Sequence, residues 1–88
     1  MVGVTERAAK ELKAKLERRS AGWEEALRLL PTPQGKFVLV VDTELSADQV
    51  VEYEGRKVLF IGVEYLRSLE GLTIDCHDTQ EGPVLFTR

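Results

Sequence analysis

The sequence contains few of the residues that build chemical centres. Its 88 residues include one cysteine, one histidine, one methionine and no asparagine. A lone cysteine cannot form an internal disulfide, which excludes a disulfide-stapled secreted scaffold and indicates a reducing compartment. The scarcity of heat-labile residues beside many arginines and glutamates is a pattern also found in thermophilic proteins.

Long apolar runs and an excess of positive charge are also missing. No stretch approaches the roughly 20 apolar residues that span a bilayer, and the N-terminus has a polar helical pattern where a secretory signal would be apolar. The net charge of −3 gives no general attraction to phosphate backbones. These absences predict a cytoplasmic protein that binds neither membrane nor nucleic acid.

Catalytic signatures are absent as well. The single histidine leaves little room for a serine or cysteine hydrolase, and the chain has no glycine-rich phosphate loop or dinucleotide fingerprint. We therefore predict that the protein is not an enzyme. With 43% hydrophobic and 31% charged residues, the chain is expected to fold as one soluble domain over residues 1–88.

The first third of the chain predicts a helix followed by an ambiguous segment. Residues 4–19 have an apolar stripe at helical spacing, and Thr5 is a suitable N-cap. Residues 23–30 leave two interpretations open. Helix propensity favours a helical turn, whereas the alternation around Leu27 and Leu29 before Pro31 favours a short strand.

The middle of the chain predicts strands. Residues 37–41 (FVLVV) are apolar on both faces, which predicts a core strand covered on both sides. Residues 42–49 form an acidic loop, and we expect its carboxylates to be there for solvation. Residues 50–54 and 57–61 flank Gly55 as the arms of a β-hairpin do.

The last third predicts a helical turn and two more strands. Residues 64–69 form a single turn closed by Gly71, and strands follow at residues 72–76 and 84–86. The fold class is therefore α+β and mostly β, with an N-terminal helix followed by mixed or antiparallel strands. The aromatic side chains that we expect to pack against the core are Trp23, Tyr53 and Tyr65.

Several strings resemble one family over nearly the whole chain. FVLVVD, TELSADQ, VVEYEGRKVLFI and YLRSLEGLTID follow in the order found in the HesB-like domain of A-type iron–sulfur carriers. The sharpest local match is L-x-x-L-x-G-x-x-I-D, formed by Leu66, Leu69, Gly71, Ile74 and Asp75. The resemblance implies a compact β-sandwich or pseudo-barrel, a homo-oligomer, and iron–sulfur assembly proteins as partners.

The resemblance also implies a chemistry whose ligands are missing here. The family's chemistry needs one thiolate in a glycine-rich segment after the second element and two in a C-x-C pair near the C-terminus. In this chain the first cysteine position falls in a segment that contains Pro33, Gln34 and Gly35 and no sulfur. The sequence reaches Arg88 before any C-x-C pair. Because sulfur-bound iron is held by several thiolates, we expect no iron–sulfur cluster and no other cofactor.

The string DCHD contains the densest group of metal-ligating residue types, and Cys76 and His77 are its candidate ligands. On a strand, however, neighbouring side chains point to opposite faces, so four consecutive residues cannot surround one ion. The favoured interpretation makes Cys76 a small buried apolar residue and His77 a surface residue near a turn. A metal shared between two subunits is the alternative.

Three functions follow from these observations. The first is a role in iron–sulfur cluster biogenesis, with any iron held between subunits or together with a competent carrier. The second is a structural or interaction protein that has the same fold and no metal, and the residues favour it. The third is a small-molecule site in the cleft near Gln34 and Gly35, which would need converging polar groups.

Overall fold

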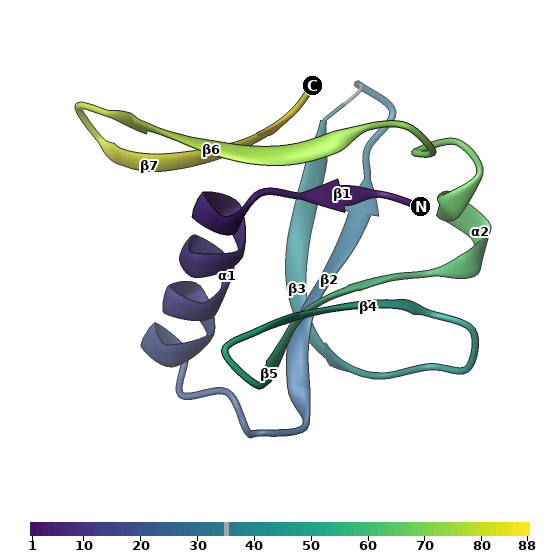
Figure 1. Ribbon diagram of the computed structural model, residues 1–88, viewed down its shortest axis with the longest axis horizontal. Coiled ribbons are helices and arrows are strands. Elements are labelled where there is room, and N and C mark those ends of the chain that lie inside the picture. The colour runs from purple at the N-terminus through teal and green to yellow at the C-terminus, as the bar shows by residue number, and fades with distance from the viewer. Residues whose placement is uncertain (35) are drawn as a thin grey trace.

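Two small β-sheets and one long helix enclose the apolar core of the molecule (Figure 1). The computed structural model describes residues 1–34 and 36–88. The elements are β1 (Gly3–Val4), α1 (Glu6–Arg18), β2 (Glu25–Pro31), β3 (Phe37–Thr43), β4 (Gln49–Tyr53), β5 (Arg56–Ile61), α2 (Val63–Leu66), β6 (Thr73–Thr79) and β7 (Gly82–Thr87).

The strands form a four-stranded sheet in the order β3-β2-β5-β4 and a three-stranded sheet in the order β1-β6-β7. The β2–β5 and β1–β6 pairs are parallel, and the other pairs are antiparallel. The predicted α+β, mostly β class is therefore confirmed. Within the described ranges the two sheets stay separate, so the chain forms no closed barrel.

The first helix begins two residues later than the sequence predicted. Thr5 has extended backbone angles and accepts a hydrogen bond from the Ala8 amide at 3.1 Å, as an N-cap does. Val4 precedes this cap and pairs with Ile74 of β6 instead of starting the helix. The predicted apolar stripe is confirmed, because α1 buries Leu12 and Leu16.

The ambiguous segment is a strand. β2 is paired on one side with β3 over its full length and on the other with β5, and these pairs override the local helix propensity. Leu27 and Leu29 point into the core and are 0% and 1% exposed. The alternation of the leucines was therefore the informative signal.

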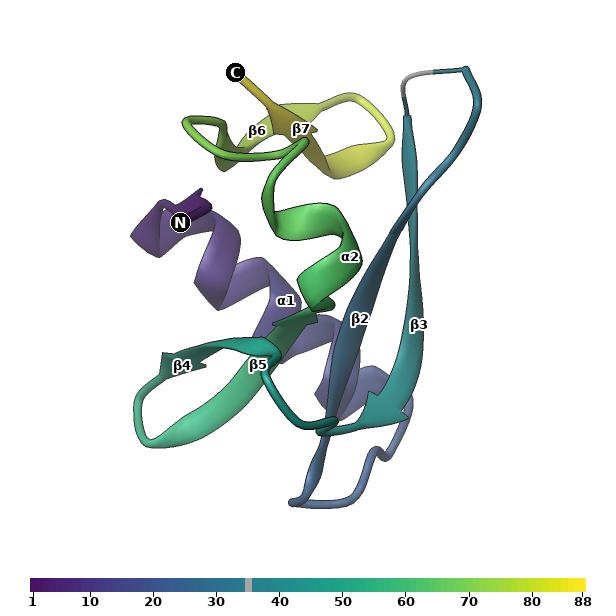
Figure 2. The ribbon, with the colours of Figure 1, turned by 90° about the vertical axis from the view of Figure 1, so that its right-hand side faces the viewer.

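β3 corrects one prediction. The strand exists, but it is the edge of its sheet and is covered on one face only (Figure 2). Val38 and Val40 are 50% and 39% exposed, whereas Phe37, Leu39 and Val41 pack against the core. Apolar side chains on both faces of a strand do not reveal whether a partner layer is present.

The hairpin and the glycine turn are confirmed. β4 and β5 pair in antiparallel fashion around Glu54 and Gly55, whose positive φ angles of 53° and 78° suit a tight hairpin turn. α2 is a short turn of helix over Val63–Leu66. Gly71 has φ +85°, a conformation that L side chains rarely adopt, as the predicted closing turn requires.

Two of the three aromatic predictions are confirmed, and one is wrong. Tyr53 and Tyr65 pack against the core as expected. The prediction for Trp23 was wrong, because its side chain is 69% exposed and lies over the guanidinium of Arg56, with the guanidinium carbon 5.3 Å from the ring centre. Arg56 itself is buried and donates to the carbonyl oxygens of Ala21 and Gly22. The Arg56 side chain therefore takes the place at the core edge that we expected Trp23 to occupy.

Neither helix in the described part of the chain has the length and apolarity to cross a bilayer.

Replacing Leu12 by alanine should lower the free energy of unfolding by about 2–5 kcal/mol, because Leu12 is 1% exposed and its removal leaves a cavity. Urea denaturation measures the loss. Leu45→Ala is the matched control, since Leu45 is 57% exposed and its truncation should cost about 0.5 kcal/mol or less. Equal losses in the two variants would contradict the packing described above.

Candidate functional site

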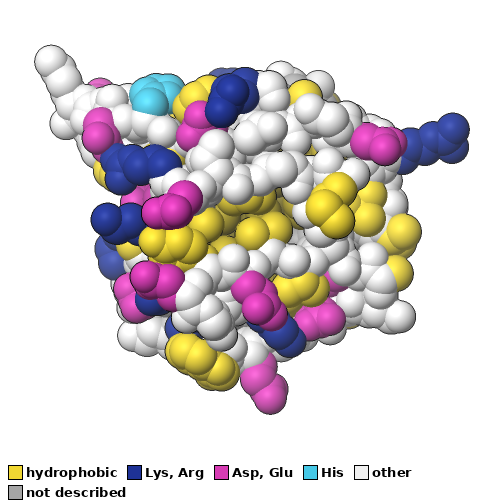
Figure 3. Space-filling model, viewed as in Figure 1, with side chains coloured by type: hydrophobic (Ala, Val, Ile, Leu, Met, Phe, Trp, Pro, Cys, Tyr) yellow, Lys and Arg dark blue, Asp and Glu magenta, His cyan; other side chains and the backbone are white. Residues whose placement is uncertain are grey.

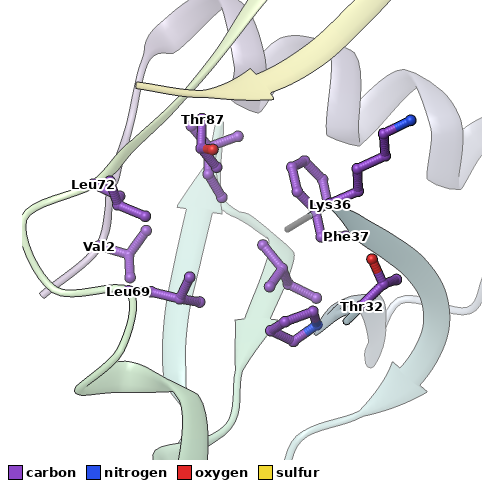
Figure 4. A pocket seen from close by; sticks show the side chains of 10 residues that line it. Val2, Thr32, Lys36, Phe37, Leu69, Leu72 and Thr87 are labelled. Carbon is purple, nitrogen blue, oxygen red and sulfur yellow. The ribbon is translucent and has the colours of Figure 1, made fainter. Parts of the chain in front are cut away.

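An apolar pocket lies where the two sheets and the β2–β3 turn come together. Its volume is about 130 Å³ (Figure 4). The lining residues come from both termini, from the β2–β3 hairpin and from the segment around β6: Val2, Leu29, Pro31, Thr32, Lys36, Phe37, Leu69, Leu72, Ile74 and Thr87. The pocket therefore joins segments that are far apart in the sequence.

The pocket is lined by the segment to which the resemblance assigned the first cluster cysteine and by the end of the last strand. Thr32, Lys36 and Phe37 come from the 31–37 segment, where the first cysteine was expected, and Thr87 is the last residue of β7. Gln34 is exposed and does not line the pocket, and Gly35 lies outside the described residues. The pocket therefore lies beside the predicted cleft, and Gln34, which we predicted to line it, does not.

The chemistry of this lining is apolar. Its polar side chains are two threonine hydroxyls and one lysine, and no sulfur is among them. Figure 4 shows the Lys36 side chain extending away from the apolar side chains of Val2, Leu69 and Leu72. Across the turn the Thr32 amide donates to the Lys36 carbonyl oxygen at 2.9 Å. The site can therefore hold a small apolar group but offers no soft ligand for iron.

The two candidate metal ligands lie on opposite faces of β6. Cys76 is 7% exposed and belongs to the core cluster, and burial raises the pKa of its thiol. His77 is exposed, and its ring makes an edge contact with Phe86 at 4.8 Å between centroids. Figure 3 shows the histidine side chain, coloured cyan, on the surface. The structure does not bring the pair together, and their metal role stays a prediction.

The two aspartates that flank this pair are bound by other residues. Asp75 accepts from the Cys76 amide at 2.8 Å, from the Thr5 hydroxyl at 2.8 Å and from Arg88 at 3.0 Å. The Cys76 amide, followed by the Thr5 hydroxyl, lowers the pKa of Asp75. Asp78 forms an ion pair with Arg7. Among the described residues, no group of three histidine, cysteine, aspartate or glutamate side chains is placed to hold a metal ion.

A buried arginine organises the acidic loop. Arg28 is 6% exposed, lies 5.5 Å from the Phe60 ring centre and donates to Asp42 at 2.7 Å. It also donates to both oxygens of Asp48, at 3.0 and 2.7 Å. The Asp48 side chain is 1% exposed, so the expectation that solvation explains the acidic loop was wrong for this carboxylate, whereas the side chains of Asp42 and Glu44 are 41% and 43% exposed. The Arg28 hydrogen bonds lower the pKa of both carboxyls.

The sequence contains a pattern that predicts this cluster. Arg28 alternates with Leu27 and Leu29, so on a strand it must lie on the opposite face from them. A charged residue inside a strand of this kind needs a carboxylate partner, and the acidic loop supplies two. Arg28 lies over the Phe60 ring and binds two carboxylates of the loop, so the cluster is a structural device rather than a reactive site.

Comparison with known proteins identifies the fold. No protein-family model and no curated protein sequence matches the chain. Among solved structures, Escherichia coli SufA, which is involved in biosynthesis of iron–sulfur clusters, has a TM-score of 0.77 at 18% identity, with 99% of this chain and 83% of that chain covered. A protein from Aquifex aeolicus has a TM-score of 0.71 at 23% identity, covering 99% of this chain and 89% of the other.

A third structure carries a cluster. IscA, solved with a 2Fe–2S cluster, has a TM-score of 0.64 at 21% identity, with 100% of this chain and 84% of that chain covered. At these identities the likeness establishes the fold and leaves activity open. It confirms the fold that the HesB-like resemblance predicted.

Asp48→Asn should weaken the fold and reduce its sensitivity to acid. The Arg28 hydrogen bonds lower the folded-state pKa of Asp48 below the unfolded value of about 3.9. The stabilisation is therefore present above that pH and is lost as the pH falls through the folded-state pKa. At pH 7 we expect a loss of about 1–3 kcal/mol, measured by urea denaturation across pH 3–7.

Glu70→Gln is the control, because Glu70 is exposed and takes part in no ion pair between described residues. If Asp48→Asn had the same free energy of unfolding as this control at every pH, the Arg28 cluster would not stabilise the fold.

The Cys76 thiol should react slowly in the native protein, because it is buried and its pKa is raised, so that little thiolate forms. Labelling with Ellman's reagent is expected to be slow under native conditions and immediate in guanidinium chloride. Immediate labelling of the native protein would place the thiol at the surface and contradict the packing of β6 against α1.

Proposed function

We propose that this chain serves iron–sulfur cluster biogenesis as a protein-binding accessory on the carrier fold, and that it holds no cluster through thiolates of its own. The observation that carries the proposal is the pocket between the sheets. It lies against the 31–37 segment, in which the resemblance places the first cluster cysteine, and its lining is apolar. The family relationship is part of the proposal and is supported by the fold shared with SufA and IscA.

The donor groups at the pocket do not fit an iron–sulfur cluster. Such clusters are held by several cysteine thiolates, and histidine is their commonest substitute. The polar groups here are the hydroxyls of Thr32 and Thr87 and the ammonium of Lys36. A protonated amine has no lone pair to donate, and a neutral hydroxyl is a weak ligand for soft, sulfur-bound iron.

The cysteine of this chain is in the wrong place to compensate. Cys76 does not line the pocket, and it packs in the core beside residues of α1. Its register partner on β7 is Leu85, two residues before the pocket-lining Thr87. A thiol that is buried against apolar side chains behaves as a small hydrophobic residue, which is the role that we assign to Cys76.

The proposed partners are iron–sulfur assembly proteins, with a second copy of this chain as an additional one, in the cytoplasm. This assignment rests on the shared fold and on the resemblance. The alternative is a protein that uses the same fold for an interaction outside cluster biogenesis. The two functions differ in whether a competent carrier binds the chain.

Anaerobic reconstitution with iron and sulfide tests the first part of the proposal. After desalting, the protein should be folded and colourless, and its residual iron should not change in Cys76→Ser. E. coli SufA, treated in parallel, is the positive control for the procedure. Stoichiometric iron with a visible charge-transfer band that disappears in Cys76→Ser would overturn the proposal.

Calorimetric titration against reconstituted E. coli SufA tests the second part. A saturable interaction with the carrier is expected if the chain works in cluster biogenesis. Injection of the chain into buffer without the carrier gives the heat of dilution and is the negative control. Absence of binding by the folded chain would favour the alternative function.

A further inference from the structure

A second hollow runs between β3 and β7. It adjoins the pocket described above, with which it shares Lys36, Phe37 and Thr87. It consists of two adjoining spaces of about 410 and 390 Å³, which share Phe37, Val84 and Leu85 in their walls. We call this space the β3–β7 groove. One wall is formed by residues 36–39, and the other is formed by residues 83–87.

Both walls are free strand edges. β3 ends the four-stranded sheet and pairs with β2 on one side, while β7 ends the three-stranded sheet and pairs with β6 on one side. The outward N–H and C=O groups of such edges are available to an added strand. A groove between two free edges is therefore suited to a segment in extended conformation.

The groove and its margin carry exposed apolar side chains. Val38 and Val40 on β3 are 50% and 39% exposed, and Val84 on β7 is 42% exposed. Small soluble proteins seldom leave several large apolar side chains exposed together unless something covers them. Alternate apolar side chains of an extended segment would bury these valines.

The groove is positively charged although the chain as a whole is negative. Lys15, Arg19 and Lys36 line it, and among the residues that the structure describes no acidic side chain does. Lys15 makes a long contact of 3.7 Å with Glu11, whereas no ion pair between described residues includes Arg19 or Lys36. Cations without carboxylate partners on a chain of net charge −3 favour an acidic occupant.

We propose that the β3–β7 groove binds an extended segment of a partner protein in which acidic residues alternate with apolar ones. The segment adds as a strand to one free edge, places its apolar side chains against Val38 and Val84, and directs its carboxylates to Arg19 and Lys36. This inference deepens the accessory role proposed above and rests on it for its biological setting.

A second copy of this chain is a poorer occupant. Residues 51–54 (VEYE) and the acidic loop both have a suitable charge pattern. Val51 and Tyr53, however, already pack against the core of their own chain, and Arg28 already binds Asp42 and Asp48 of the loop. Undocking that loop would leave a buried arginine without a partner, which is strongly unfavourable. A foreign segment carries no such cost.

Fluorescence anisotropy with a labelled peptide tests the inference. The probe is a short peptide of alternating glutamate and valine. The matched probes are its lysine–valine counterpart and the same acidic peptide with N-methylated backbone amides, which cannot complete a strand ladder. We expect saturable binding of the first probe alone, with an affinity that falls as salt is raised.

Variants test whether the acidic peptide binds in the β3–β7 groove. The double variant Arg19→Glu, Lys36→Glu should lower the affinity for the acidic probe at least about tenfold. The matched control is Lys10→Glu, Arg67→Glu, which makes the same change in net charge outside the groove and should leave the affinity unchanged. Val84→Glu should also weaken binding. Val63→Glu on α2, at a site that is 58% exposed, is its control.

Equal binding of the acidic and basic probes, undiminished binding of the N-methylated peptide, or equal effects of groove and control variants would overturn the inference. So would concentration-dependent dimerisation that excludes the probe, measured by light scattering on the same samples. Reconstitution and SufA titration are read separately, so failure of the peptide to bind would not alter those results.

Discussion

The position of β2 between β3 and β5 is the constraint on which the rest of the structure depends. Its leucines face the core beneath α1, and its arginine faces the other way, over Phe60. On that second face Arg28 binds Asp42 and Asp48, which fixes the loop between β3 and β4. One strand therefore joins the helix, the four-stranded sheet and the acidic loop, through an apolar face on one side and an ion-pair cluster on the other.

The sequence predicted the elements better than their surroundings. The helix, the hairpin around Gly55 and the last two strands, β6 and β7, follow from local periodicity and turn chemistry, which act over a few residues. The exposure of β3 and the burial of Asp48 depend on layers supplied by distant segments. FVLVV looks the same whether a partner layer covers it or not, and an acidic loop looks solvated until Arg28 of β2 is placed beside it.

The candidate site shows the same division. Strand alternation alone separated Cys76 from His77, and the structure has them on opposite faces of β6. The pocket could not be predicted in detail, because Val2, Ile74 and Thr87 reach it from segments that are adjacent only in the folded chain. The β3–β7 groove has no sequence signal of its own, since it is the space between two strand edges of different sheets.

The fold and the chemistry of this protein are separable for a physical reason. The residues that carry the resemblance, such as Leu69 and Ile74, pack in or against the core, and Gly71 adopts a positive φ, so they are needed whether or not a metal binds. The core packs without a thiol in the 31–37 segment, so the fold alone does not determine the chemistry. In this chain the free edges of β3 and β7 and the exposed valines beside them line a groove in which Arg19 and Lys36 form no ion pair with a described residue.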